Sequence, residues 1–181
     1  MATQSKKKKP AAKTKAKTKA TKKGSQKPLV GVIYASTTDE PVMKECGFIL
    51  ERFGISFETS MFSAHRQPEK TAAYAKSARK RGLKVLVAGA GMAAHLPGVL
   101  ASMTTLPVVG VPLCGSALEG QDALFSMVQM PAGVPVPTLA VGKAGAKNAA
   151  LLAVQMLALS DPSLVRKLDD LKKRMEGGEK L

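Results

Sequence analysis

The chain has 181 residues, of which 45% are hydrophobic and 4% aromatic, and it carries a formal net charge of +15. This length accommodates one domain of ordinary size with an appendage. The longest apolar stretch, residues 85–106, is interrupted by glycines, His95 and Pro97, which argues against a transmembrane helix. Cys46 and Cys114 lie far apart, so we interpret them as reduced, buried thiols of a cytoplasmic protein, with no zinc pattern.

The positive charge is concentrated in residues 1–27, which hold eleven lysines, no acidic residue and no large aliphatic residue after Met1. Removing those eleven charges from +15 leaves +4 for residues 28–181, the predicted domain. We expect the tail to be disordered, because it cannot bury enough apolar surface to offset the entropy lost on ordering. It could bind nucleic-acid phosphates or an anionic membrane, or act only as a solubility segment, the interpretation favoured here. It has neither the arginines of a transit peptide nor the apolar region of a signal peptide.

From residue 29 onward, apolar runs alternate with amphipathic segments. In chain order, the first half is predicted as strand 29–35, helix 40–53, strand 55–62, helix 67–81, strand 85–88 and helix 93–104. The second half is predicted as strand 107–111, a partly helical segment 118–130, strand 136–141, helix 144–159 and a charged helix from Asp161 to about Met175. Repeated βα units of this length predict an α/β fold, a parallel sheet with helices on both faces.

The second half is poor in charge. Between residues 85 and 142 only Glu119 and Asp122 carry formal charge, so the helices there have no obvious solvent face. We therefore expect a sizeable homo-oligomer in which these helices contact other subunits.

Both histidines follow predicted strands. His65 and Arg66 follow strand 55–62, and His95 lies shortly after strand 85–88. An imidazole can transfer a proton near neutral pH, and a guanidinium offers fixed donors to a phosphate or carboxylate. A His-Arg pair in a loop is often only a solvated surface. Loops at the carboxyl ends of parallel strands meet at one edge, however, so these residues predict a small-molecule site.

Two further loops reach the same predicted edge. Ser36-Thr37-Thr38-Asp39 precedes a helix and could seat a phosphate or bind ribose hydroxyls, although a Ser/Thr/Asp cluster also serves ordinary helix capping. Residues 89–94 read Gly-Ala-Gly-Met-Ala-Ala, a loose match to the dinucleotide fingerprint. The acidic residue that would bind the ribose is missing, since the first acid after strand 107–111 is Glu119, so no nicotinamide cofactor is expected. The glycines indicate a tight turn or a close backbone approach, with or without a ligand.

A family resemblance rests on motifs that occur in order along residues 28–168. They are Ser63-Ala64-His65-Arg66-x-Pro68, Ala88-Gly89-Ala90-Gly91-x-Ala93-Ala94-His95-Leu96-Pro97-Gly98, Gly110-Val111-Pro112, Gln129-Met130-Pro131 and Gly142-Lys143-Ala144-Gly145-Ala146. Together they closely resemble the 5-(carboxyamino)imidazole ribonucleotide mutases of purine and IMP biosynthesis, the bacterial class of the phosphoribosylaminoimidazole carboxylase family. The Arg after His65 and the AAHLPG run resemble the mutase class rather than the carboxylase that uses free carbon dioxide.

The resemblance implies a three-layer αβα, flavodoxin-like domain assembled as an octamer, with no metal and no organic cofactor. It implies an isomerase that moves a carboxylate from the exocyclic nitrogen to ring carbon 4, with His65 as general acid and base. Ser36 and Arg66 would bind the phosphate, Asp39 the ribose, and Gly89, Ala90 and Gly91 would approach the ring and carboxylate, with His95 supporting the site. The full set of substrate-binding residues implied is Ser36, Thr38, Asp39, Ser63, Ala64, Arg66, Gly89, Ala90, Gly91, His95 and Leu96.

The sequence also departs from the family pattern. Ala35 replaces a usual glycine before the Ser-Thr loop, Met92 replaces the second glycine of a usual pair, and Pro137 stands where glycine is common. Met92 is bulky and is not expected to adopt a positive φ angle. These changes leave open a relative with a changed substrate, and the lysine tail leaves open a non-catalytic binding protein.

Overall fold

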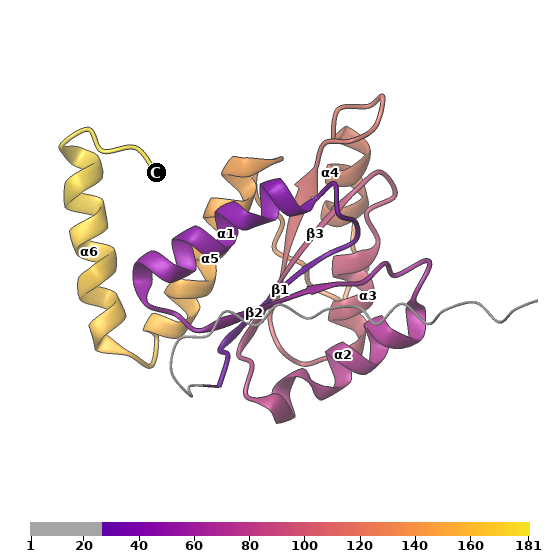
Figure 1. The fold of residues 1–181 in the computed structure, drawn as a ribbon, viewed down its shortest axis with the longest axis horizontal. Helices are drawn as coiled ribbons and strands as arrows, with labels where there is room; N and C mark the ends of the chain where they lie inside the picture. Colours follow the sequence, from indigo (N-terminus) through magenta and orange to yellow (C-terminus); the bar gives the residue numbers. More distant parts are fainter. Residues whose placement is uncertain (1–26) are drawn as a thin grey trace, which may run out of the picture.

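The computed structural model describes residues 27–181 (Figure 1), so the predicted disorder of the tail concerns residues that lie outside the described part, apart from Lys27. The elements are β1 (Val30–Tyr34), α1 (Glu40–Phe53), β2 (Phe57–Met61), α2 (Pro68–Arg81), β3 (Val85–Gly91), α3 (Leu96–Met103), β4 (Val108–Leu113), α4 (Gln121–Val128), α5 (Lys143–Ala158) and α6 (Pro162–Glu176). The order and type of the predicted helices are confirmed, and among the strands only the last prediction is wrong.

The strands form one parallel sheet in the order β2-β1-β3-β4, which confirms the α/β class. β1 lies inside the sheet, where Val32 is paired with Thr59 of β2 on one side and with Val87 of β3 on the other. The chain therefore leaves β1 toward β2 and then crosses back to β3, as in flavodoxin-like sheets.

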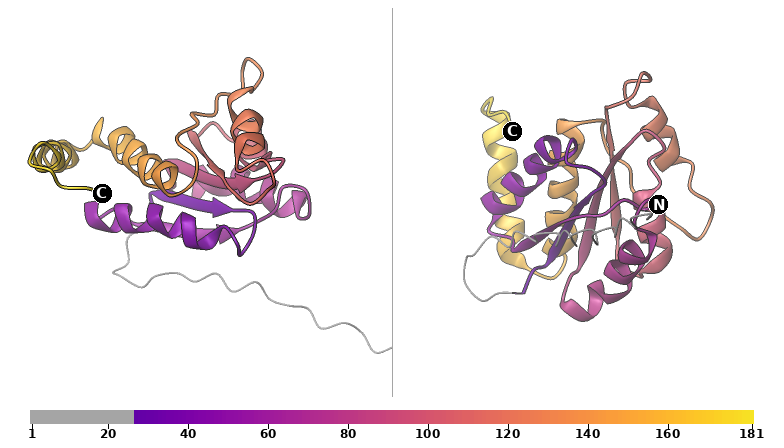
Figure 2. Two further views of the ribbon diagram at one scale, coloured as in Figure 1. Left: turned by 90° about the horizontal axis from the view of Figure 1, so that it is seen from above. Right: turned by 45° about the vertical axis from the view of Figure 1, so that its right-hand side comes forward.

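Helices cover both faces of the sheet (Figures 1 and 2). Successive side chains of a strand point to opposite faces, so buried residues of β1 alternate between two cores. Val30 and Val32 pack in one core with α1 and α5, whereas Ile33 packs in a second core with α2 and α3. The result is the predicted three-layer αβα sandwich.

The predicted strand 136–141 is wrong. The segment contributes a single parallel bridge, between Gly110 and Thr138. Pro135 and Pro137 have no N–H to donate, so a continuous ladder with β4 cannot form. Two main-chain hydrogen bonds still hold the segment against Gly110, which accepts from Leu139 N at 3.3 Å and donates to Pro137 O at 2.8 Å.

Three smaller expectations need correction. β3 continues to Gly91, beyond the predicted end at residue 88, and α3 begins at Leu96 instead of residue 93. Cys46 is buried as expected, and burial raises the pKa of its thiol to about 12. Cys114 is exposed, because it directly follows β4 at the open edge of the sheet.

No helix of residues 27–181 has the length and apolar character needed to cross a bilayer.

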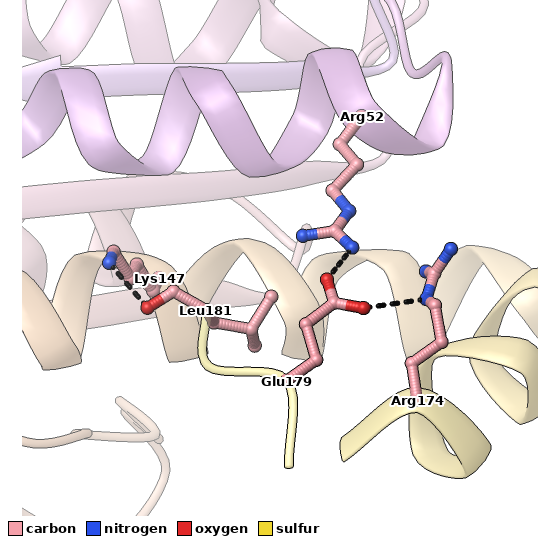
Figure 3. Close-up of polar contacts among 5 residues, drawn as sticks. All are labelled: Arg52, Lys147, Arg174, Glu179 and Leu181. Atoms are coloured by element: carbon pink, nitrogen blue, oxygen red, sulfur yellow. Dashed lines mark hydrogen bonds and ion pairs between the residues drawn. The ribbon is translucent and has the colours of Figure 1, made fainter. Parts of the chain in front are cut away.

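The C-terminal helix α6 lies at the margin of the fold, beside α5 (Figure 2). Leu164 and Leu171 bury its apolar face. Beyond α6 the chain turns back, and Glu179 forms ion pairs with Arg52 of α1 and, at 3.1 Å, with Arg174 of α6 (Figure 3). These ion pairs connect the C-terminal segment to two helices.

Glu179→Gln should weaken this connection in a pH-dependent way. The hydrogen bond from Arg52 lowers the pKa of Glu179 below its usual value of 4.5. The carboxylate therefore stabilises the fold above about pH 4.5, and this contribution disappears as the pH falls through the lowered pKa. Urea unfolding should show a lower midpoint for Glu179→Gln at pH 7, and the difference from the unmodified protein should shrink steadily as the pH is lowered below 4.5. The exposed neighbour Glu176 provides the control, since Glu176→Gln should leave the midpoint in place throughout this pH range; a pH-independent effect of Glu179→Gln would contradict this account.

Candidate active site

Three loops meet at the carboxyl edge of the sheet. They follow β1, β2 and β3, and because β1 lies between the other two, its loop lies between theirs. In open α/β sheets the ligand crevice forms at such a point, where successive connections leave in opposite directions. The residues predicted for the site lie on these three loops or next to them, at the end of β3 and the start of α3.

The two histidines are in direct contact across this edge. His65 Nε2 lies 2.8 Å from His95 Nδ1, and the two rings meet edge to face with centroids 4.9 Å apart. One of these nitrogens donates its N–H and the other accepts with its lone pair. If both nitrogens carried a proton, two donors would face each other and the hydrogen bond would be lost. Both side chains are exposed, which leaves the pair accessible to a ligand that gives or takes a proton.

The loop that carries His65 is held by its own hydrogen bonds. Ser63 is buried, and its hydroxyl accepts from the main-chain N–H of Arg66 at 3.2 Å. The main-chain N–H of Gln67 donates to the Ser63 carbonyl at 2.8 Å. Arg66 then reaches across to the first loop, where its Nη2 donates to the carbonyl of Ala35 at 3.4 Å. This contact holds the guanidinium of Arg66 over the loop that precedes α1, and the other N–H donors of the guanidinium can still bind a ligand.

The first loop presents hydroxyls and a carboxylate. Ser36 Oγ accepts from the hydroxyl of Thr38 at 2.9 Å and from its N–H at 3.3 Å. Asp39 occupies the N-cap position of α1 but makes no side-chain capping bond, so ordinary capping does not account for its carboxylate. Burial raises the pKa of Asp39, against hydrogen bonds from the backbone of Ser36 and Ala35 and the nearby charge of Arg66.

Four of the predicted residues lie deeper than the loop surface. Gly89 and Ala90 are buried inside β3, and a Cβ on Gly89 would lie 2.4 Å from the sulfur of Met43, so this glycine makes room for a core side chain. Leu96 is 2% exposed and packs in the core, and Ala64 is partly buried. The side chain of Leu96 therefore points away from the loops, and only Gly91, at the end of β3, brings a predicted glycine to the edge.

Met92 overturns one expectation. It adopts the left-handed conformation, with φ 56°, although its side chain disfavours that region. The turn from β3 toward His95 requires a positive φ here, and the preceding glycines do not supply it. The Met92 side chain is 61% exposed, so the sulfur is not packed into the interior of the described chain.

Two features of the site could not be found from residue types. The carbonyl of Ala35 acts as a hydrogen-bond acceptor for Arg66, a role that any residue could fill. The loop from Cys114 to Gly120 follows β4 at the same edge, but its sequence carries no recognisable ligand motif. Residues 66–70, which directly follow His65 in the chain, line a shallow hollow. Within residues 27–181 no three metal-binding side chains gather.

Fold and site together define a flavodoxin-like α/β protein with two histidines in direct contact at the switch point of its sheet. The family model for AIR carboxylase matches residues 29–177. The chain belongs to this family.

Several curated relatives share about half of their aligned residues with this chain. It is 53% identical over 156 residues to the N5-carboxyaminoimidazole ribonucleotide mutase of Pyrococcus horikoshii, which covers 84% of this chain and 87% of the relative. It is 54% identical over 143 residues to the mutase of Bacillus subtilis, covering 79% and 88%. Among solved structures, Treponema denticola PurE superposes with a TM-score of 0.70 at 26% identity, covering 83% of this chain and 91% of that one.

Met92→Gly should stabilise the protein relative to Met92→Ala. Alanine keeps the strain of a side chain at positive φ, whereas glycine adopts this conformation freely. Chemical denaturation should place the glycine variant about 1 kcal/mol above the alanine variant in free energy of unfolding. Equal stabilities would show that the loop relaxes out of the left-handed conformation at no cost.

Proposed function

We propose that this protein is an N5-carboxyaminoimidazole ribonucleotide mutase of purine biosynthesis, with His65 as its proton carrier. The observation that carries the proposal is the 2.8 Å contact between His65 and His95, beside Arg66 and Asp39, in a member of this family. Relatives named for this reaction are 51% to 54% identical to the chain over most of its length, which supports the same substrate.

The reaction moves a carboxylate within one molecule. The bond between the exocyclic nitrogen and the carboxylate carbon breaks, its electrons remain on nitrogen, and protonated His65 supplies the proton that completes the amine. Carbon 4 of the ring then attacks the released carbon dioxide. Neutral His65 removes the hydrogen from carbon 4, which restores the aromatic ring and returns the histidine to its starting state. Atoms and protons balance without a co-reactant.

The loops around His65 fit the remainder of such a substrate. The guanidinium of Arg66 reaches the loop before α1, where a phosphate would meet it together with the hydroxyl of Ser36 and the positive end of the helix dipole. The carboxylate of Asp39 makes no capping hydrogen bond, so it can accept hydrogen bonds from ribose hydroxyls. Holding carbon dioxide between these loops avoids its escape to solvent and keeps the second step intramolecular.

His95 acts in this scheme as a positioning residue. Its Nδ1 meets Nε2 of His65, which fixes the orientation of the His65 ring. Substrate entry must exchange this hydrogen bond for one to the reacting nitrogen or carbon, since Nε2 offers a single position.

A changed substrate is the second candidate, favoured by Met92 and Ala35. Met92 is exposed at the turn between β3 and His95, and Ala35 adds a methyl group beside the loop that would seat phosphate. An assay with N5-carboxyaminoimidazole ribonucleotide separates the candidates, because a relative with another substrate would give no turnover.

We further propose that the protein works as a homo-oligomer in the cytoplasm, an octamer if it follows the assembly that the resemblance implies. Leu118, Phe125 and Val128 are 59%, 62% and 49% exposed in and beside α4, within the charge-poor part of the chain. A surface of this kind favours contact with another subunit.

His65→Asn should abolish turnover without unfolding the protein, because asparagine keeps a hydrogen bond but cannot carry the proton. General acid–base catalysis contributes about 10² to 10⁴ in rate, so kcat should fall at least 100-fold while the thermal midpoint stays in place. The matched control is His95→Asn, which should lose about tenfold or less, since it retains the proton carrier. Near-normal activity of His65→Asn would refute its role.

Phe125→Lys should dissociate the oligomer, because it sets a charge in the proposed apolar contact. Sedimentation should report a smaller mass than for the unmodified protein. Phe48→Lys, an exposed phenylalanine of α1 outside the charge-poor part, should keep the full mass. An unmodified protein that sediments as a monomer would overturn the assembly proposal.

A further inference from the structure

The two histidines bring two nitrogen ligands together at the surface of the described chain. His65 Nε2 and His95 Nδ1 lie 2.8 Å apart, and the planes of the two rings meet at 87°. Both side chains are exposed, so dissolved ions can reach them. The neutral imidazole is the commonest metal ligand in proteins, and either of its ring nitrogens can bind a metal ion.

The spacing of these nitrogens matches that of adjacent ligands on a transition-metal ion. Bonds from a metal ion to imidazole nitrogen are about 2.0 to 2.1 Å long. Two such bonds at a right angle place their nitrogens about 2.8 to 3.0 Å apart, whereas the tetrahedral angle of Zn²⁺ requires about 3.3 Å. The observed 2.8 Å therefore favours Cu²⁺ or Ni²⁺, which take tetragonal nitrogen and oxygen ligands. Each ring must tilt to aim its lone pair at the ion, a movement that exposed side chains can make.

The histidine pair can bind an ion without releasing a proton from the protein. In the free pair, one of the two facing nitrogens carries a hydrogen. A neutral imidazole can carry its hydrogen on either nitrogen, so the ring can shift it to its outer nitrogen, which is Nδ1 of His65 or Nε2 of His95. Both facing nitrogens then present lone pairs, and two metal–nitrogen bonds replace one hydrogen bond.

The surroundings of the pair limit the affinity for such an ion. Within residues 27–181 no third metal-binding side chain joins the histidines, so water must fill the remaining positions. Arg66 follows His65 directly and repels a cation, although the nearby carboxylate of Asp39 offsets part of this charge. A site with two protein ligands should therefore bind reversibly, unlike the closed four-ligand sites of structural metals.

We propose that the His65–His95 pair binds a divalent transition-metal ion of the Cu²⁺ or Ni²⁺ type, and that the bound ion blocks turnover. The second part rests on the proposed function, in which His65 carries the proton. A metal ion on Nε2 of His65 occupies the lone pair of that nitrogen, so the nitrogen can neither accept nor donate a proton. Substrate and metal ion therefore exclude each other, and removal of the ion should restore activity.

The test of binding titrates NiCl₂ alone into the full-length protein by calorimetry. Ni²⁺ is the probe because Cu²⁺ also reacts with thiols, and Cys114 is exposed. The unmodified protein should bind one ion per chain at the pair. His65→Asn and His95→Asn should each bind it at least tenfold more weakly, since each variant keeps one imidazole and loses the chelate. Cys114→Ser is the control and should stay within about twofold of the unmodified protein.

The test of inhibition uses N5-carboxyaminoimidazole ribonucleotide as substrate. NiCl₂ should raise the apparent KM of the unmodified protein and of Cys114→Ser while leaving kcat in place, and EDTA should restore the original KM. The remaining activity of His95→Asn should need at least tenfold more NiCl₂ for the same inhibition, because this variant offers the ion a single imidazole.

Equal nickel affinities for the unmodified protein and the two histidine variants would overturn the metal site, as would a loss of binding in Cys114→Ser. Binding that depends on both histidines but leaves turnover unchanged would overturn the block. Binding through both histidines in a protein that does not turn over this substrate would support the metal site, while the proposed function and the block that rests on it would both be wrong. Thermal midpoints of all variants should match the unmodified protein, so that weaker binding reports a lost ligand and not unfolding.

Discussion

The pairing of β1 between β2 and β3 is the constraint on which the site depends. Main-chain hydrogen bonds on both edges hold Val30–Tyr34 in register with two strands that are distant in sequence, and its side chains are buried on both faces. This arrangement sets the loop after β1 between the loops after β2 and β3. His65 can then meet His95, thirty residues away, and Arg66 can reach the carbonyl of Ala35.

The same parallel arrangement gives the two edges of the sheet opposite characters. α1, α2 and α3 begin at the carboxyl edge, so their positive dipole ends face the site where we propose an anionic substrate. α2 ends at the amino edge, and cations gather there around its last carbonyls and the turn to β3. The chemistry that we propose for His65 thus lies at the edge where three helices begin.

Gly89 and Met92, at the end of β3 and just after it, show that the structural role of a residue depends on its packing. Gly89 belongs to the motif that points to a ligand, yet its missing side chain leaves room for the sulfur of Met43 beneath α1. Met92 bears the positive φ of the turn although glycine would adopt it without strain. The sequence pattern located this loop correctly, but it could not assign these tasks, because they depend on core neighbours that are remote along the chain.

The alternation of strands and helices, the parallel α/β class, the family and the two histidine loops could be predicted from the sequence, because apolar periodicity and turn residues act over short distances. The prediction was wrong for residues 136–141, whose apolar side chains predict a strand while Pro135 and Pro137 withhold the donors that a ladder needs. The contact of the two histidine rings and the reach of Arg66 to the carbonyl of Ala35 could be found only in the folded structure, as could the uncapped carboxylate of Asp39 and the exposure of Cys114. The first two arise because sheet order brings together segments that are distant in the chain, which local sequence does not encode.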